Sequence, residues 1–517
     1  MLMLHRGAQM ESVVFRMGIL ASLRSMKEFG KAIGVMLTAS HNKEEDNGLK
    51  LIDPMGEMLK MSWEGYCTQV ANAESTEDLV AVLKNIVKEE GINTNIKAKI
   101  VYGCDTRPTA KMLVAALERG LEAMDAGTTN YGVVTTPQLH YFVCCINTEN
   151  TERAYGEPTV DGYNKKLAKS FQKLVEHCRP KRALHVDCAN GVGAIQVEKL
   201  AHAIGKDYLD VVIHNAEVSV ENRLNVKCGA DHVKTTQSAP LGVPMVPGER
   251  YCSFDGDADR LVYYFLDEGK QFHLLDGDRI ASLVAMYIRD LLETAELRKF
   301  NLGVVQTAYA NGSSTRYIRE SLGLPVVMAN TGVKYLHHEA EKFDIGVYFE
   351  ANGHGTILFN PKTRDMLHAF EPQSPAQQEA VEKLLALRDV INETIGDAMS
   401  DMLVVEAILA TKDWCLDDWN QTYTGLPNKL MKVTVKDRSI FRTTNAEQTL
   451  VQPEGLQDMI DQKVERYING RSFVRPSGTE DAVRVYAEAS TSDKVDELAL
   501  GVAQLVYDYA DGVGPRP

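Results

Sequence analysis

The sequence predicts an α/β protein built from several domains, and three observations carry that prediction. The chain has 517 residues, which is more than one hydrophobic core accommodates, so about three or four domains are expected. From about residue 30 onward, short apolar runs alternate with helical patterns, which is typical of α/β layers with largely parallel sheets. After about residue 430 the order of elements changes, and this tail is predicted to be a smaller α+β module.

The expected elements follow from the apolar patterns in order. The first buried strand covers residues 32–39 and ends at Ser40, and a helical stripe over 79–87 precedes a strand over 99–103. The later predicted strands cover residues 183–186, 210–213, 302–306, 325–328 and 345–349, with helices at 313–322 and 333–343 between the last of them. In the tail the predicted strands are 430–435, 472–474 and 483–487, the helices lie near 455–465 and 492–509, and residues 411–428 are expected to be a linker.

The composition excludes several classes of function. A formal net charge of -15 argues against a general binder of nucleic acid or anionic membranes, so neither partner is expected. The nine cysteines lack metal spacing, which indicates reduced thiols in the cytosol. No apolar run approaches the roughly 20 residues of a membrane span, and the first residues lack a secretory signal. We therefore expect a cytoplasmic protein, in which an anionic substrate would need a local basic pocket.

The first loop with distinctive chemistry contains Ser40. It reads TASHN over residues 38–42 and continues with DNG over 46–48, a sequence that favours turns and exposes backbone N–H groups to an anion. Because the loop follows a buried strand, Ser40 is expected at the carboxyl edge of a sheet, where α/β enzymes place ligands. A serine needs a base or a cation to act as a nucleophile, and His41 and Lys50 are the nearby candidates. The alternative is a polar turn with a capping serine.

The second loop reads DGDADR over residues 255–260. In an extended segment Asp255, Asp257 and Asp259 would project to one side. Three carboxylates that lie close together repel one another unless a cation or protons compensate, and oxygen-only ligands suit Mg²⁺. The loop therefore predicts a metal site, with an exposed acidic turn as the weaker alternative.

Two later loops combine polar side chains with glycines. EANGHG over residues 350–355 is suited to hydrogen bonding of sugar hydroxyls, through Glu350 as an acceptor and Asn352 as donor and acceptor. RPSGTE over residues 475–480 combines a guanidinium, two hydroxyls and flexible backbone amides, as an anion-binding loop would, and Arg484 adds a second cation. Simple turns are the alternative interpretation of both.

The four loops together resemble those of the α-D-phosphohexomutase superfamily, in the same order and from about residue 14 to the C-terminus. TASHN followed by DNG, with EANGHG as the sugar loop, is similar to the phosphoacetylglucosamine mutase family within it. The resemblance implies an α/β fold of three successive α/β phosphohexomutase domains plus a C-terminal α+β domain around a central cleft. The implied phosphoserine, magnesium-binding, sugar-binding and phosphate-binding domains cover residues 1–150, 151–275, 276–410 and 411–517.

The resemblance also implies roles for the motif residues. Ser40 is the phosphorylated residue, and its phosphate binds Mg²⁺ together with Asp255, Asp257 and Asp259. Lys50 matches a lysine suspected of acid/base catalysis, and His41 belongs to the catalytic motif. The residues implied to bind substrate are Glu350, Ala351, Asn352, Gly353 and His354 in the sugar loop, and Arg475, Pro476, Ser477, Gly478, Thr479 and Arg484 around the phosphate.

The activity implied by the resemblance is an intramolecular phosphate transfer. Such a mutase interconverts N-acetylglucosamine 6-phosphate and N-acetylglucosamine 1-phosphate through the phosphoserine and a 1,6-bisphosphate intermediate, and supplies UDP-N-acetylglucosamine biosynthesis. A hexose 1,6-bisphosphate is the expected activator, the partner is a small sugar phosphate, and the protein is expected to be a monomer or a weak homodimer.

Two departures from the family pattern leave alternatives open. The segment before residue 14 does not match the family, which suggests a shortened N-terminus and the loss of a strand or of one phosphate contact. Lys43 replaces the family's proline in the serine loop, which gives up rigidity and adds a cation. The alternatives are a phosphoglucomutase or phosphomannomutase, a non-catalytic truncated isoform, and a phosphatase.

Overall fold

The computed structural model describes residues 2–179, 181–478 and 480–517, and it contains two compact units. Unit 1 comprises the chain up to Asp276 together with Asn352–Thr356 and Glu382–Leu416. Unit 2 comprises Gly277–Ala351, Ile357–Val381 and Asp417–Pro517. Among the described residues, no helix combines the length and the apolar character that crossing a membrane requires.

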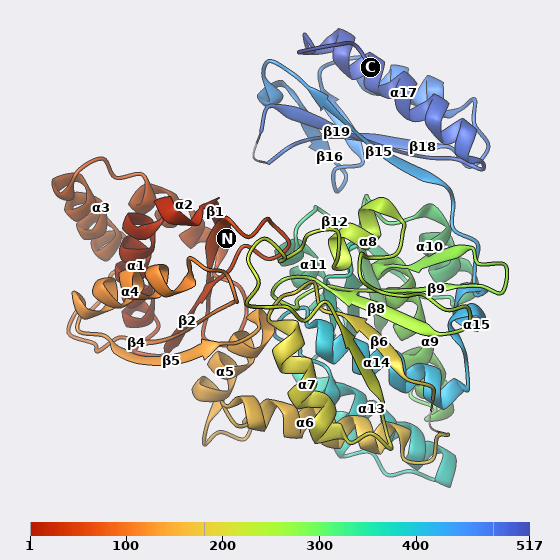
Figure 1. Cartoon of the computed structure of the whole chain (residues 1–517), viewed down its shortest axis with the longest axis horizontal. Helices are drawn as coiled ribbons and strands as arrows, with labels where there is room; N and C mark the ends of the chain where they lie inside the picture. The colour runs from red at the N-terminus through yellow and green to blue at the C-terminus, as the bar shows by residue number, and fades with distance from the viewer. Residues whose placement is uncertain (1, 180, 479) are drawn as a thin grey trace. The chain divides into compact units, whose positions relative to one another are not determined.

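The first sheet of unit 1 has five strands in the order β1-β3-β2-β4-β5 (Figure 1, red to orange). The strands are β1 (Leu2–Arg6), β2 (Ala32–Leu37), β3 (Asp46–Ile52), β4 (Lys99–Cys104) and β5 (Gly127–Val133). Strands β2, β4 and β5 are parallel, whereas β3 runs antiparallel to both β2 and β1. The sheet is therefore mixed, and the hairpin from β2 to β3 contains the serine loop.

Helices cover both faces of this sheet, which explains the continuous apolar run of β2. The helices are α1 (Glu11–Lys27), α2 (Met61–Ala71), α3 (Thr76–Glu89), α4 (Ala110–Glu122) and α5 (Thr136–Thr148), with a short 3₁₀ turn at Gly7–Gln9. Ile33 and Val35 join one core with buried residues of α1, α2, α3 and α4. Gly34 faces the other way, and a Cβ there would lie 2.8 Å from Val143 of α5. A strand buried on both faces needs apolar residues at every position.

The second sheet of unit 1 has the order β10-β9-β8-β6-β7. Its strands are β6 (Leu184–Asp187), β7 (Val211–His214), β8 (Arg250–Phe254), β9 (Leu261–Leu266) and β10 (Phe272–Leu275). The helices of this region are α6 (Val160–Val175), α7 (Gly193–Ile204), α8 (Ala230–Thr236) and α14 (Ala398–Lys412). A buried ion pair between Arg250 and Glu406 joins β8 to α14, so the late segment of unit 1 is an integral part of its core.

Unit 2 contains a four-stranded sheet in the order β12-β11-β13-β14. The strands are β11 (Leu302–Thr307), β12 (Val326–Ala329), β13 (Ile345–Phe349) and β14 (Gly355–Phe359), whose first residues belong to unit 1. The helices are α9 (Gly277–Thr294), α10 (Gly312–Arg316), α11 (Val333–Ala340) and α12 (Pro361–His368), and α13 (Pro375–Val390) continues into unit 1. The helix predicted over 313–322 consists of α10 followed by a π-helical turn at Tyr317–Ser321.

The C-terminal part of unit 2 is an antiparallel sheet in the order β15-β19-β18, covered by a helix (Figure 1, blue). Its elements are β15 (Asn428–Thr434), a 3₁₀ turn (Arg438–Ile440), β16 (Arg442–Thr444), β17 (Thr449–Gln452), α16 (Leu456–Val464), β18 (Arg471–Pro476), β19 (Ala482–Glu488) and α17 (Ser492–Tyr509). Val483 and Val485 of β19 share a core with Val502 and Val506 of α17. This is the α+β module that the tail predicts.

Three sequence predictions need correction. The two sheets of unit 1 are mixed rather than largely parallel, because β3 and β9 return as antiparallel hairpin partners, whereas β11 pairs in parallel with β12 and β13 as predicted. Asp46–Gly48, predicted as a turn, begins strand β3. The predicted linker contains α15 (Leu416–Asn420), where Trp419 is buried and its indole N–H donates to the carbonyl of Arg279 at 3.3 Å. The predicted order of three α/β segments and an α+β tail is confirmed.

Candidate active site

Ser40 follows β2 and is held in an unusual backbone conformation. Its φ is 52°, in the left-handed region that non-glycine residues rarely adopt, and the residue is 3% exposed. Its amide donates to Thr38 Oγ1 at 2.9 Å, and its own hydroxyl donates to Asp255 Oδ2 at 2.6 Å. The serine side chain therefore points at the aspartate loop.

The aspartate loop is a tight turn after β8. Ala258 has a φ of 58°, so the prediction of an extended segment is wrong, and the turn is what brings the carboxylates together. Asp255, Asp257 and Asp259 are all buried and each offers an oxygen within 4.8 Å of the others. Burial, followed by repulsion from the other two carboxylates, raises the pKa of Asp255 well above its usual value.

Lys50 supplies the cation that this acidic group requires. It lies on β3, and its Nζ is 2.9 Å from Asp257 Oδ2 and 2.8 Å from Asp259 Oδ2. Burial by itself would lower the pKa of Lys50, but the two carboxylates outweigh burial and raise it. The same ammonium helps to hold the pKa of Asp259 well below its usual value, against the opposing effect of burial. Lys50 is thus protonated, and its single positive charge offsets part of the negative charge of the two carboxylates.

The carboxylate oxygens fit a hard divalent cation. Asp257 Oδ1 and Asp259 Oδ1 are buried and have no hydrogen-bond partner among the described residues. Buried anionic oxygens without partners are costly unless a cation satisfies them. An all-oxygen donor set of this kind suits Mg²⁺, which commonly combines carboxylates with a phosphate oxygen.

His41 follows Ser40 and is partly buried. Its Nδ1 has no hydrogen-bond partner within the part of the chain that the structure describes. Burial lowers the pKa of His41, and the positive charge of Arg260 lowers it further. Arg260 itself lies 3.9 Å from carboxylate oxygens of both Asp255 and Asp259.

The sugar loop predicted at 350–355 is divided between the two units. Glu350 and Ala351, both half-buried, belong to unit 2, whereas Asn352, Gly353 and His354 belong to unit 1. His354 Nδ1 lies 2.7 Å from the carbonyl oxygen of Asp259 and therefore donates to it. Asn352 Oδ1 accepts the amide of His354 at 2.9 Å.

Gly353, like His354, packs closely beside the aspartate loop. It has a φ of 89°, and a Cβ there would lie 1.9 Å from the carbonyl oxygen of Leu261. Glycine is needed both for the conformation and for the close approach. The structure thus brings Gly353 and His354 to the aspartate loop.

The predicted phosphate loop lies in unit 2. Arg475 of β18 is directly opposite Arg484 of β19, and two facing cations need anions nearby. Arg475 Nε donates to Glu447 Oε1 at 2.8 Å, and Arg484 Nη2 lies 3.2 Å from Glu480 Oε1.

The remaining residues of the predicted phosphate loop follow β18. Pro476 is the last residue of the strand, and the amide of Ser477 donates to the carbonyl of Ala482 at 2.8 Å. A Cβ at Gly478 would meet no described atom within 4 Å. Thr479, predicted in the same loop, lies outside the described residues. The two arginines are thus the strongest anion-binding groups that the structure places here.

Several site residues were not predicted from the sequence. Thr136, at the start of α5, donates from Oγ1 to Asp257 Oδ2 at 2.6 Å. Arg107 and Asn225 bind the backbone of the serine loop. Arg107 follows β4, which is parallel to β2, so its position at the carboxyl edge of the same sheet was an available signal. Asn225 lies in an irregular loop and carries no comparable signal.

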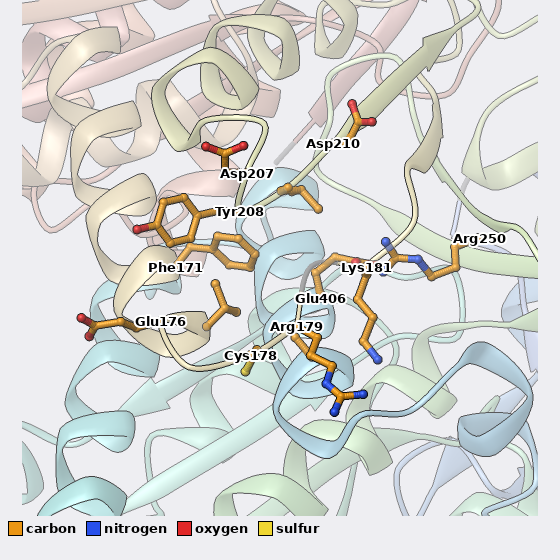
Figure 2. Close-up of a pocket in the computed structure, with 13 residues that line it drawn as sticks. Phe171, Glu176, Cys178, Arg179, Lys181, Asp207, Tyr208, Asp210, Arg250 and Glu406 are labelled. Carbon is orange, nitrogen blue, oxygen red and sulfur yellow. Dashed lines mark hydrogen bonds and ion pairs between the residues drawn. The ribbon is translucent and has the colours of Figure 1, made fainter.

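A separate cavity of about 130 Å³ lies elsewhere in unit 1, among residues of α6, α14 and the loop before β7 (Figure 2). Phe171 and Tyr208 lie on one side of it and Arg250 and Lys181 on the other. Arg250 is paired with Glu406, and Lys181 Nζ lies 2.7 Å from Asp413 Oδ1. Both cations are paired with carboxylates, and the described lining of the cavity contains no group of three buried carboxylates like the one beside Ser40.

Comparisons with known proteins find one family over most of the chain. Residues 146–262 and 276–414 match the models for domains II and III of phosphoacetylglucosamine mutase AMG1. Residues 21–66 and 62–150 match domain I, and residues 430–505 the C-terminal domain, of phosphoglucomutase/phosphomannomutase. The pig phosphoacetylglucosamine mutase is 47% identical over 518 residues, covering 98% of this chain and 93% of the relative. The mouse enzyme is 48% identical over 514 residues, with the same coverage.

The chain belongs to the phosphoacetylglucosamine mutase family.

Solved structures of the family have the same fold. The Aspergillus fumigatus N-acetylphosphoglucosamine mutase, solved in complex with GlcNAc-6P and magnesium, is 51% identical, has a TM-score of 0.95, and is matched over 98% of this chain and 94% of its own. The same relative has also been solved in complex with glucose 1,6-bisphosphate, with a TM-score of 0.94, 51% identity and the same coverage. The phosphoacetylglucosamine mutase family thus includes members with a sugar phosphate and a divalent cation bound.

Proposed function

We propose that this protein interconverts N-acetylglucosamine 6-phosphate and N-acetylglucosamine 1-phosphate through a phosphoserine at Ser40 and a 1,6-bisphosphate intermediate. The observation that carries the proposal is the Ser40 hydroxyl, which lies 2.6 Å from Asp255 in a buried group of three carboxylates. This arrangement, in a member of the phosphoacetylglucosamine mutase family, is suited to a serine that exchanges a phosphoryl group. The product enters UDP-N-acetylglucosamine biosynthesis.

The chain's own residues hold and orient the reacting serine. Asp255, Asp257 and Asp259 are the residues that would hold Mg²⁺. When bound, the cation neutralises charge on the transferring phosphoryl group. Ser40 Oγ carries the phosphoryl group and gives it to a hydroxyl of the sugar, so the new O–P bond forms as the serine O–P bond breaks. In the return step, the other phosphoryl group of the bisphosphate passes to Ser40.

Lys50 is our candidate for proton transfer during these steps. Its ammonium is fixed by hydrogen bonds at 2.9 Å and 2.8 Å to Asp257 and Asp259, so its protons lie beside the residues that hold the transferring group. His41, whose Nδ1 is buried without a partner among the described residues, is the second candidate. In the first transfer the proton of the attacking hydroxyl passes to a neutral base such as His41, while the Lys50 ammonium gives a proton to Ser40 Oγ as the serine O–P bond breaks; the return step reverses both proton transfers.

The sugar and phosphate loops provide substrate binding in this proposal. Glu350, Ala351, Asn352, Gly353 and His354 form the sugar loop. Arg475, Pro476, Ser477, Gly478, Thr479 and Arg484 bind the phosphate that is not reacting. Arg475 and Arg484 are paired with Glu447 and Glu480, and in this proposal the phosphate dianion takes over part of these hydrogen bonds.

The wider setting also remains a proposal. We propose Mg²⁺ as the resident metal, a hexose 1,6-bisphosphate as activator and a cytoplasmic location, without a nucleic-acid or membrane partner. The four functional domains are proposed to be residues 1–150, 151–275, 276–410 and 411–517, in a monomer or a weak homodimer.

The test is ³¹P NMR of the purified protein with N-acetylglucosamine 6-phosphate, Mg²⁺ and a trace of hexose 1,6-bisphosphate. The 1-phosphate resonance is expected to appear, and a Ser40→Ala variant is expected to give none. Failure of the folded protein to convert this substrate would overturn the proposal. Relative kcat/KM on the glucose and mannose phosphates distinguishes it from the two related mutases, because a higher value on either would reassign the substrate.

A further inference from the structure

The backbone of the serine loop is held by two side chains that converge on the same two oxygens. Arg107 Nη2 donates to the carbonyl of Ser40 at 2.8 Å and to the carbonyl of Asn42 at 3.0 Å. Asn225 Nδ2 donates to the same carbonyls, at 2.9 Å and 3.0 Å. Each oxygen thus accepts two hydrogen bonds, which fix the Ser40–His41 and Asn42–Lys43 peptide planes.

Arg107 donates from its two terminal nitrogens to carbonyls between residues 40 and 46. The residue is 2% exposed, and its Nε donates to Asp105 Oδ2 at 3.0 Å. Its Nη1 donates to the carbonyls of Asp46, at 2.8 Å, and of Lys43. Arg107 therefore ties the beginning of the loop to its end, where β3 starts.

Asn225 belongs to the part of the chain that forms the second sheet of unit 1. It lies between β7 and α8 and has a φ of 59°, and its backbone N–H donates to the carbonyl of Ala189 at 2.9 Å. A Cβ added to Gly256 would lie 2.5 Å from the Ser40 carbonyl oxygen and 2.9 Å from Asn225 Nδ2. The serine loop, Asn225 and the aspartate loop are therefore in direct packing contact beside Asp255.

We propose that Asn225, together with Arg107, is a positioning residue for phosphoryl transfer at Ser40. Arg107 shapes the serine loop from within the first sheet's segment, and Asn225 sets that loop against the aspartate loop, so that Ser40 Oγ faces Asp255. Neither residue is assigned contact with the sugar phosphate. The inference rests on the proposed mutase function, and its prediction is that loss of Asn225 slows transfer without weakening substrate binding.

The experiment compares Asn225→Ala with a matched control, Asn222→Ala. Both asparagines have a φ of 59°, so alanine suffers the same left-handed strain at either position. The exposed Asn222 side chain is not among the groups that bind the serine loop, and its backbone N–H, which donates to Glu44, is retained by alanine. Asn225→Gly and Asn222→Gly form a second pair, because glycine adopts this φ without strain.

Two measurements separate positioning from simple stability. In Asn225→Ala, kcat is expected to fall about ten- to a hundredfold while KM for the sugar phosphate changes less than about twofold, since a misplaced reacting group costs rate rather than binding. Hydrogen exchange followed by mass spectrometry is expected to show faster exchange in peptides spanning residues 38–48. Asn222→Ala should change neither, and the glycine pair should repeat the contrast if the alanine variants fold poorly.

The outcomes distinguish this inference from the function on which it rests. An unchanged kcat in a folded Asn225 variant, or a rise in KM alone, would overturn the positioning role. If the parent protein converts no hexose phosphate, the mutase function fails. Hydrogen exchange then still decides whether Asn225 fixes the serine loop, because unchanged exchange would overturn that part as well.

Discussion

Replacing Lys50 with methionine is expected to make the stability of unit 1 depend on magnesium. The side chain is 19% exposed and its ammonium contacts two buried carboxylates, those of Asp257 and Asp259. Methionine keeps a similar length and removes the charge. In the absence of metal, both carboxylates are then left buried without their cation.

The structure sets the size of the effect. Breaking a buried ion pair by removing one partner costs about 3–5 kcal/mol, because the remaining charge stays desolvated. Because unit 1 has about 300 residues and the unfolding entropy is about 2.1 cal/mol/K per residue, each kcal/mol shifts Tm by about 1.5 °C, so Lys50→Met is expected to lower Tm by about 5–8 °C in EDTA. Mg²⁺ neutralises the same oxygens, so saturating Mg²⁺ should reduce this difference to about 2 °C or less. Wild type should gain less from Mg²⁺, because the cation competes with Lys50.

Differential scanning calorimetry with EDTA or Mg²⁺ measures both effects. The control is Lys234→Met, which removes an ion pair with Asp276 and none of the contacts of the three loop carboxylates. Its loss of Tm should be the same with and without Mg²⁺. Equal stabilisation of wild type and Lys50→Met by Mg²⁺ would refute the reasoning, since Lys50 and the metal would then not share the same carboxylates.

Three other perturbations test separate parts of the structure. Glu406→Gln leaves Arg250 as a buried cation without its anion and should lower stability by about 3–5 kcal/mol, measured by urea unfolding, whereas a loss under about 1 kcal/mol would contradict a buried pair. Burial raises the pKa of Glu57 from its usual value to about 7, so its contribution to stability is fully present below pH 4.5 and is lost as pH rises through 7. Glu57→Gln should therefore be more stable than wild type above pH 7, by up to about 3 kcal/mol, and equal stability at pH 8 in urea titrations would argue against the raised pKa. Arg475→Met should raise KM for the sugar phosphate about ten- to a hundredfold, because a charge-assisted hydrogen bond contributes about 1.5–3 kcal/mol. Arg475→Lys keeps the charge and should have a smaller effect. An unchanged KM in steady-state kinetics would show that Arg475 does not bind the substrate.

The sequence was sufficient to locate functional groups whose motif lies within a few consecutive residues. Ser40 follows an apolar strand, and the aspartate loop contains three carboxylates within five residues, so both could be recognised in short windows. The helices and strands of the C-terminal module were also predicted closely, because α17 and the apolar strands β18 and β19 carry clear periodicities.

Other features depend on contacts that a short window does not contain. Arg107 is 67 residues from Ser40 and Asn225 is 185 residues away. The sequence around Asn225 contains no pattern that predicts its contact with the serine loop. Strand β3 was mistaken for a turn because Asn47 and Gly48 have turn propensities, which antiparallel pairing with β2 overrides. His354 was predicted from its loop as a sugar ligand, whereas its contact with the carbonyl of Asp259 is visible only in three dimensions.

The return of residues 382–416 to unit 1 has a consequence for synthesis of the chain. Unit 1 begins at the N-terminus, but the helix that carries Glu406, the partner of Arg250, is translated only after strands β11 to β14 of unit 2. At about 5–20 residues per second, the ribosome needs on the order of ten seconds to progress from Asp276 to Leu416. During that interval Arg250 has not yet met Glu406, and the surface that α14 later covers remains uncovered. A nascent chain arrested near residue 276 should accordingly engage chaperones more than one arrested well past residue 416.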